Sequence, residues 1–125
     1  MNEMSDSEQL ALLQRAFDVL PSGVLITDCL QSDDPIVYVN QSFLTMTGYS
    51  EGEVIGQNCR FLQGDQTDPM ALAELAKAVH AHEKMTVRLV NYRKDGESFL
   101  NEFTIFPIKN AQGVVTHCLG IEEAI

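Results

Sequence analysis

The chain of 125 residues has no tryptophan, little cysteine and few basic residues. Its 8 Lys and Arg stand against 18 Asp and Glu, which gives a net charge of −10. Because nucleic acids and anionic lipids are bound through basic surfaces, this balance argues against direct binding of either. No apolar run approaches the roughly 20 residues that a membrane-spanning helix needs. The N-terminal sequence MNEMSDSEQ lacks the basic and apolar parts of a signal peptide, so we expect a cytoplasmic protein.

The three cysteines are Cys29, Cys59 and Cys118, an odd number without a CxxC pair. This pattern argues against a disulfide framework and against a zinc site. His80 and His82 stand two residues apart at the end of a helical segment, and we expect both to be solvated. We therefore expect no bound metal.

Apolar periodicity and turn signals predict a single domain behind an N-terminal helix. Helical spacing covers residues 7–20 and residues 67–81, and Pro69 lies in the first turn of the second segment. Short helical turns are expected over residues 42–46, 50–55 and 59–62. Strand patterns cover residues 24–28, 36–40, 85–93, 98–108 and 114–122. This order predicts an α+β fold, in which a five-stranded antiparallel sheet carries helices on one face. We assign residues 1–22 to an N-terminal cap helix and residues 23–125 to the main domain.

The most informative motif is the run GQNCRFLQG over residues 56–64. Its thiol, Cys59, lies between the amide of Asn58 and the guanidinium of Arg60, with a second amide at Gln63. The amides can read the polar edge of a heterocycle, and the arginine can clamp a phosphate. The set suits a phosphorylated aromatic cofactor that has a reactive carbon held near a sulfur.

This run closely resembles the flavin-binding signature of the light-oxygen-voltage (LOV) domains, a branch of the PAS sensor family. The likeness extends from Val24 to Ile121. Further motifs follow in the same order: Tyr38-Val-Asn-Gln-Ser-Phe43, Thr47-Gly-Tyr49, Asn91-Tyr-Arg-Lys-Asp-Gly96, Phe99-Leu-Asn101 and Gly120-Ile121. The resemblance implies the PAS fold and a bound flavin.

Carried over residue by residue, the resemblance places Cys59 against the C4a carbon of the flavin. It implies that Asn58 and Gln63 bond the ribityl chain, that Arg60 pairs with the phosphate, and that Asn91 and Asn101 meet the pyrimidine edge. The remaining implied contacts are Leu25, Thr27, Leu62, Leu72, Leu89, Phe103, Ile105, Cys118 and Gly120. Strand alternation independently puts Leu89 with Asn91, and Asn101 with Phe103 and Ile105, on shared faces.

The resemblance implies FMN in preference to FAD. The segment Gly64-Asp-Gln-Thr67 lacks the insertion in which FAD-binding relatives house an adenosine. Many family members carry a second phosphate-binding arginine in the following helix, and counting from Thr67 places Ala76 there. Lys77 is adjacent, but its side chain is rotated by about 100° around the helix. We therefore expect a modest loss of phosphate affinity without a loss of binding.

The last strand departs from the family pattern at one residue. Family members usually end in Gly-Val/Ile-Gln, and this glutamine contacts flavin O4 and N5 and re-orients when N5 is protonated. Here the segment is Gly120-Ile-Glu122, and Glu122 should share a strand face with Cys118 and Gly120 and point at the ring. A carboxylate cannot donate a hydrogen bond, so Glu122 is either neutral, with a pKa raised by burial, or ionised and turned towards solvent. We hypothesise that it faces the flavin and that a protonation change replaces the amide flip.

The resemblance implies a blue-light photoreceptor and not an enzyme, in which Cys59 bonds reversibly to C4a under light. One alternative is a PAS-type flavin redox or ligand sensor without productive photochemistry. Another is a cofactor-free interaction module that uses the sheet face.

Output to an unknown downstream protein is expected through the N-terminal helix, the outer sheet face or both. Apolar side chains alternate onto the face opposite the flavin, namely Val90, Leu100, Phe106, Ile108, Leu119 and Ile121. The helical stripe of Leu10, Leu13, Phe17 and Leu20 can cover that face, or a second subunit can. We favour a homodimer.

Overall fold

Five antiparallel strands form the centre of the molecule in a computed structural model that describes residues 3–125. The strands are β1 (Gly23–Asp28), β2 (Ile36–Val39), β3 (Met85–Tyr92), β4 (Ser98–Lys109) and β5 (Val115–Ala124), in the spatial order β2-β1-β5-β4-β3. The C-terminal strand β5 therefore lies in the middle and pairs with β1 and β4. The predicted α+β fold with a five-stranded antiparallel sheet is confirmed.

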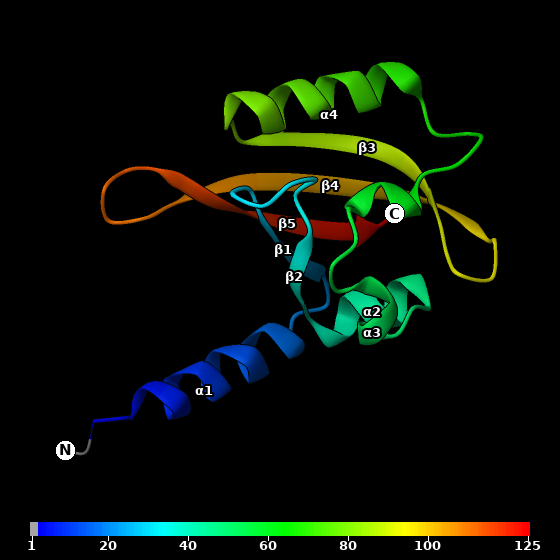
Figure 1. The fold of residues 1–125 in the computed structure, drawn as a ribbon. Coiled ribbons are helices and arrows are strands. Elements are labelled where there is room, and N and C mark those ends of the chain that lie inside the picture. Colours follow the sequence, from blue (N-terminus) through cyan, green and yellow to red (C-terminus); the bar gives the residue numbers. More distant parts are fainter. Residues whose placement is uncertain (1–2) are drawn as a thin grey trace.

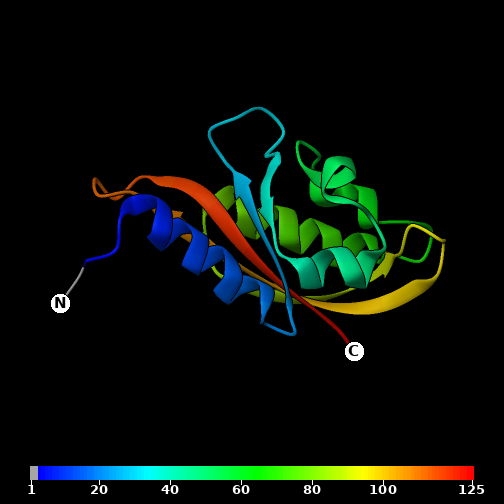
Figure 2. The same ribbon diagram turned by 90° about the horizontal axis from the view of Figure 1, so that it is seen from below.

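The segment between β2 and β3 carries the helices that cover one face of this sheet (Figures 1 and 2). It contains α2 (Gln41–Thr47), α3 (Glu51–Val54), the 3-10 helix η1 (Cys59–Leu62) and α4 (Pro69–Ala81). Side-chain oxygens of Asn40, Asn58 and Asp68 accept backbone N–H groups at the starts of α2, η1 and α4. At the end of α2, Gly48 adopts φ 79°, a left-handed conformation that favours glycine.

The core lies between the sheet and these helices. Leu25, Ile36, Phe43, Val54 and Leu62 are each at most 2% exposed. They come from two strands and three helices, so the loop that carries η1 is packed directly against the sheet. This packing fixes where Cys59, the first residue of η1, can stand.

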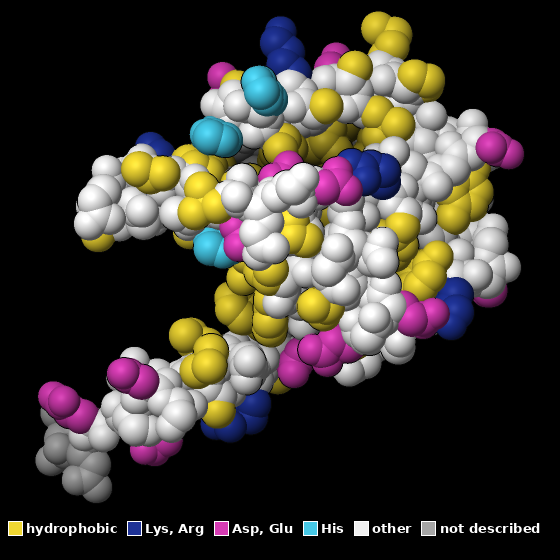
Figure 3. Space-filling view, viewed as in Figure 1, with side chains coloured by type: hydrophobic (Ala, Val, Ile, Leu, Met, Phe, Trp, Pro, Cys, Tyr) yellow, Lys and Arg dark blue, Asp and Glu magenta, His cyan; other side chains and the backbone are white. Residues whose placement is uncertain are grey.

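The N-terminal helix α1 (Asp6–Asp18) contributes no buried residue to this core. It begins at a capping box between Ser5 and Glu8, and its Leu10 and Leu13 are 58% and 56% exposed. Figures 1 and 2 place α1 on the side of the sheet opposite α4, and Figure 3 shows a hollow between α1 and the rest of the molecule. In this structure the helix does not cover the outer sheet face of its own copy of the chain, so of the two covers considered above a second subunit remains.

The attachment of α1 is confined to its C-terminal end. The buried Asn40 donates from Nδ2 to the Phe17 carbonyl at 2.7 Å, and the Gln41 amide donates to the Asp18 carboxylate at 2.8 Å. The Phe17 ring also packs on Tyr38, with 5.8 Å between the ring centroids. These contacts fix the last turn and leave the first two turns without a partner.

The predicted apolar side chains lie on the outer sheet face beside the Arg88–Glu102 ion pair, and they are only partly exposed. Leu100 is 37% exposed, and the other predicted members of that face are half-buried. Within residues 3–125, no helix has the length and apolar character required to cross a membrane.

Candidate functional site

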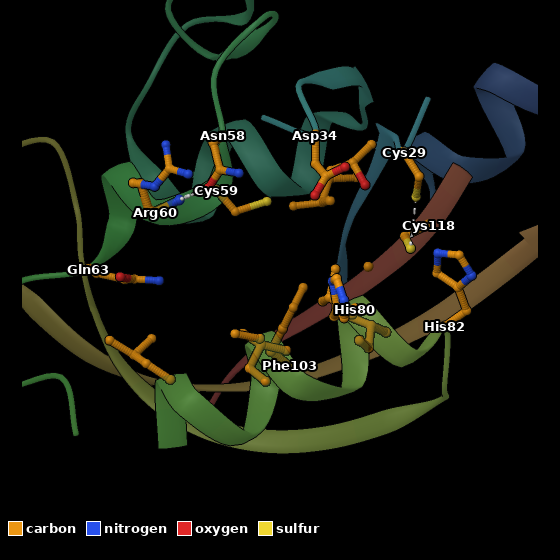
Figure 4. Close-up of a pocket in the computed structure, with 18 residues that line it drawn as sticks. Cys29, Asp34, Asn58, Cys59, Arg60, Gln63, His80, His82, Phe103 and Cys118 are labelled. Carbon is orange, nitrogen blue, oxygen red and sulfur yellow. Dashed lines mark hydrogen bonds between the residues drawn. The ribbon is translucent and has the colours of Figure 1, made fainter. Parts of the chain in front are cut away.

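A cavity of about 690 Å³ lies between the sheet, α4 and the loop that carries η1 (Figure 4). That volume falls in the range of roughly 300–1,000 Å³ that is typical of cofactor sites. Most of the predicted site residues line it: Leu25, Thr27, Asn58, Cys59, Arg60, Gln63, Leu72, Phe103, Ile105, Cys118 and Gly120. The cavity thus brings together residues from three strands, α4 and the motif over residues 56–64.

The N-terminal cap of η1 fixes the position of Cys59. The Asn58 side chain accepts the Arg60 amide at 2.9 Å and donates to the Asp33 carbonyl at 2.8 Å, which anchors the turn from both sides. The Cys59 side chain is half-buried and points towards the interior of the cavity (Figure 4). Burial, and secondarily the charge of Glu122, raises the pKa of the thiol. Cys59 therefore carries its proton at neutral pH.

A polar cluster formed by Asn91, Asn101 and Glu122 lies next to this cavity but does not line it. Asn101 donates from Nδ2 to Asn91 Oδ1 at 2.8 Å and to Glu122 Oε1 at 3.2 Å. All three residues are at most 3% exposed. The cluster is adjacent to the cavity because Phe103, a wall residue, is the cross-strand partner of Glu122.

Two oxygens of this cluster have no hydrogen-bond partner among the described residues, namely Asn101 Oδ1 and Glu122 Oε2. Leaving a buried polar atom unpaired costs about 1–3 kcal/mol, so such atoms usually mark a missing partner. Burial raises the pKa of Glu122 to about 8, against the lowering effect of the Asn101 hydrogen bond. At neutral pH the cluster then offers one unused acceptor and one unused acid proton.

Gly120 allows the strand to approach the cavity wall closely. A Cβ built there would lie 2.7 Å from Phe103 Cε1 and 3.0 Å from Leu25 Cδ1. No larger residue fits without displacing the wall. Leu62 and Leu89, also predicted as cofactor contacts, are buried in the core and do not reach the cavity.

The mouth of the cavity is exposed and carries Arg60, Ala76, His80 and His82. Arg60 forms a bidentate pair with Asp33, with Nη1 to Oδ2 at 2.8 Å, and both side chains are more than half exposed. This pair uses two of the five N–H donors of the guanidinium. Three donors remain for another anion.

Several lining residues escaped the sequence reasoning: Cys29, Asp34, Leu75, Val79, His80 and His82. Both histidines are exposed, as predicted, but they also border the mouth. His80 follows Ala76 by four residues and so shares its helix face, a spacing that could have identified it. Cys29 lies beyond the end of β1, where strand periodicity gives no direction.

Comparison with known proteins assigns this fold and motif to one family. A family model described as a PAS domain matches residues 21–123. The chain is 45% identical to a blue-light photoreceptor of Listeria monocytogenes over 84% of its length and 42% of that protein. It is 42% identical to Blue-light-activated histidine kinase 2 of Erythrobacter litoralis, over 87% of its length and 32% of the kinase.

A solved LOV domain from a blue-light-activated histidine kinase of Erythrobacter litoralis superimposes with a TM-score of 0.81. Its sequence is 42% identical, and the alignment covers 85% of this chain and 97% of that domain. The chain belongs to the PAS domain family and, within it, to the LOV branch. It spans less than half the length of the two curated relatives named above.

Proposed function

We propose that this chain is a blue-light photoreceptor domain that holds FMN in the cavity and bonds to it reversibly through Cys59. The observation that carries this proposal is the thiol of Cys59 inside a cavity that has buried, unpaired polar atoms beside one wall and, at the mouth, an arginine with three N–H donors left over from its pair with Asp33. The LOV relatives named as blue-light receptors support the same reading.

The polar cluster suits the edge of a flavin. The pyrimidine edge of that ring alternates carbonyl oxygens with an N–H group. Asn101 Oδ1 is an unused acceptor for the N–H, and the protonated Glu122 is an unused donor for a carbonyl. The chemistry of the two orphaned atoms therefore matches the group that the family implies.

The short segment over residues 64–67, next to the mouth, supports FMN over FAD, because it lacks an insertion that could house an adenosine. Thr67 donates to the Val90 carbonyl at 2.5 Å and accepts the Gly64 amide at 3.0 Å, which ties the short segment before α4 to the sheet. Arg60 stands at the mouth with three unused N–H donors, enough for a terminal phosphate.

The residues of the chain position and protect the reacting sulfur. When bound, the flavin supplies a blue-light-absorbing ring with a carbon, C4a, that accepts a thiol. Cys59 brings its own proton, because burial keeps the thiol neutral. The walls of Leu25, Phe103 and Ile105, all buried, exclude water from the sulfur. No substrate is turned over in this scheme, so the domain acts as a sensor.

Glu122 gives this domain its own way of responding. Its side chain accepts a hydrogen bond from Asn101 within the polar cluster, and burial raises its pKa to about 8, so it is protonated at neutral pH. We hypothesise that a change in its protonation carries the signal into β5. A Glu122→Gln variant should change the rate of dark recovery. Identical recovery in the variant and the wild type would refute this role.

The test of the proposed function is an absorbance measurement on purified protein before and after blue light. We expect a flavin band that bleaches and returns in the dark in the wild type. In Cys59→Ala the band should persist under light. A wild-type flavin band that does not bleach would instead support the redox or ligand sensor, and a colourless protein that takes up no added FMN would support the interaction module.

The output is proposed to run through a homodimer. Leu10 and Leu13 of α1 are exposed, Figure 3 shows a gap beside this helix, and apolar side chains such as Leu100 are partly exposed on the outer sheet face. A second copy would bury both surfaces. Light scattering should give the mass of a dimer for the wild type and of a monomer for Leu13→Glu, with Gln14→Glu as the polar control. A wild-type monomer in both dark and light would contradict the dimer.

A further inference from the structure

Two further thiols meet in the wall of the cavity, away from Cys59. Thr27 of β1 pairs with Cys118 of β5, and the Cys29 amide continues the ladder by donating to the Thr116 carbonyl at 2.9 Å. Cys29 and Cys118 are therefore diagonal neighbours on the same sheet face. Their sulfurs lie 3.3 Å apart, and both residues line the cavity (Figure 4).

This separation is within reach of a covalent bond. A disulfide has an S–S length of about 2.05 Å, so the sulfurs need to approach by about 1.3 Å from their 3.3 Å separation. Cys118 is fixed in the middle strand and is only 7% exposed. Cys29 is half-buried and stands just after the end of β1, at the start of the loop to β2. The movement therefore falls on the less constrained of the two residues.

The pair does not include Cys59, the residue of the proposed photochemistry, although both of its thiols line the same cavity. Cys59 is carried by η1 whereas Cys29 follows β1, and neither hydrogen bonds nor salt bridges connect the two among the described residues. Cys118 shares its strand face with Gly120 and Glu122. A change at Cys118 thus acts on the strand that also carries the polar cluster.

We propose that Cys29 and Cys118 form a redox-sensitive dithiol, a modification site at which a peroxide closes a disulfide between β1 and β5. One thiol attacks the peroxide, loses its proton and becomes a sulfenic acid, and water leaves. The second thiol then displaces the hydroxyl as a second water, and the S–S bond forms. Two electrons and two protons pass from the thiols to one hydrogen peroxide molecule, which yields two molecules of water.

The environment of Cys29 determines how fast peroxide oxidises the dithiol. Burial, the neighbouring Cys118 thiol and the carboxylates of Asp34 and Asp28 raise the pKa of Cys29 to about 12. Because the thiolate is the reactive form, the pair should stay reduced at low peroxide and oxidise slowly. Once one sulfur is oxidised, its neighbour at 3.3 Å is the nearest reducing partner, which favours the disulfide over further oxidation.

The test is a thiol count and peptide map of the full chain, in the dark, after hydrogen peroxide treatment. We expect the wild type to lose two of its three titratable thiols, with a mass decrease of two hydrogens and a cross-linked peptide that joins Cys29 to Cys118. Reduction with dithiothreitol should restore all three. Cys59→Ser should still lose two thiols, whereas Cys29→Ser should lose none to an intramolecular bond.

Several results would overturn the proposal. They are three intact thiols in the treated wild type, a cross-link that includes Cys59, and irreversible oxidation to sulfinic acid without any disulfide. The wild-type peptide map does not depend on whether the serine variants fold. It also needs no flavin, so it succeeds or fails independently of the photochemistry.

Discussion

The two ends of the cavity differ in the exposure and in the hydrogen bonding of their polar side chains. At the polar cluster, Asn91, Asn101 and Glu122 are nearly inaccessible, and two of their oxygens have no partner. At the mouth, Arg60 and Asp33 are more than half exposed and already paired with one another. Buried polar groups have large energetic consequences because water cannot replace a lost partner, whereas exposed ion pairs contribute little. The buried end should therefore govern stability and response, and the mouth should only tune affinity.

The sharpest contrast between the ends is in pH dependence. The pKa of Glu122 is about 8 in the folded chain against an ordinary value of 4.5, so between these values the unfolded chain has lost a proton that the folded chain retains. The free energy of unfolding should therefore fall as the pH rises from 4.5 to about 8, by a few kcal/mol in total, and then level off. Urea unfolding across this range checks it, with Glu122→Gln lacking the decline. An equal decline of the free energy of unfolding in the wild type and in Glu122→Gln would show that another group causes it.

Removing the central amide of the cluster should have the next largest effect. In Asn101→Leu, Asn91 Oδ1 and Glu122 Oε1 lose their donor while remaining buried. We expect a loss of about 1–3 kcal/mol in the free energy of unfolding of the flavin-free protein. Gln63→Leu makes the same chemical change at a half-buried wall position and should cost less. Equal losses in the two variants would break the distinction between the ends.

At the mouth, substitutions should change binding and leave folding nearly unaltered. Arg60→Ala should weaken FMN binding roughly tenfold, because a phosphate loses a charged donor. Asp33→Asn should strengthen it, because the guanidinium is released, and asparagine tolerates the positive φ of 68° at that residue. Fluorescence titration measures both. Riboflavin, which lacks the phosphate, should bind all three proteins alike, and a matching change in riboflavin affinity would contradict the assignment.

The smallest effect is expected from adding a second cation at the mouth. Ala76 lines the cavity and is exposed, so Ala76→Arg should raise FMN affinity a few-fold without altering riboflavin binding. Met70→Arg is the matched control, since it adds the same charge to the same helix at a residue that is 73% exposed and does not line the cavity. An equal gain in the control would show that net charge alone is responsible.

Strand alternation has a fixed period, so sequence patterns predicted the sheet and the shared face of Phe103 and Ile105, while the family resemblance implied which strand residues contact the cofactor. Phe103, Ile105, Cys118 and Gly120 all line the cavity as expected. The family resemblance supplied the roles that periodicity cannot, above all those of Cys59 and Arg60.

Patterns failed where tertiary packing decides the outcome. The apolar stripe of α1 indicated burial, yet Leu10 and Leu13 are exposed, because only the last turn of the helix is anchored to α2. The contact between Cys29 and Cys118 joins residues 89 positions apart and depends on the β1–β5 register, which no local signal contains. The Arg60–Asp33 pair likewise depends on how two loops meet.

Infrared difference spectroscopy of the flavin-loaded protein, dark against illuminated, tests the central claim that a neutral Glu122 faces the light-reactive site. We expect at neutral pH a carboxylic acid C=O band that shifts or disappears under blue light in the wild type and is missing from Glu122→Gln. No such band in the wild type, or the same band in both proteins, would contradict a neutral, flavin-facing Glu122.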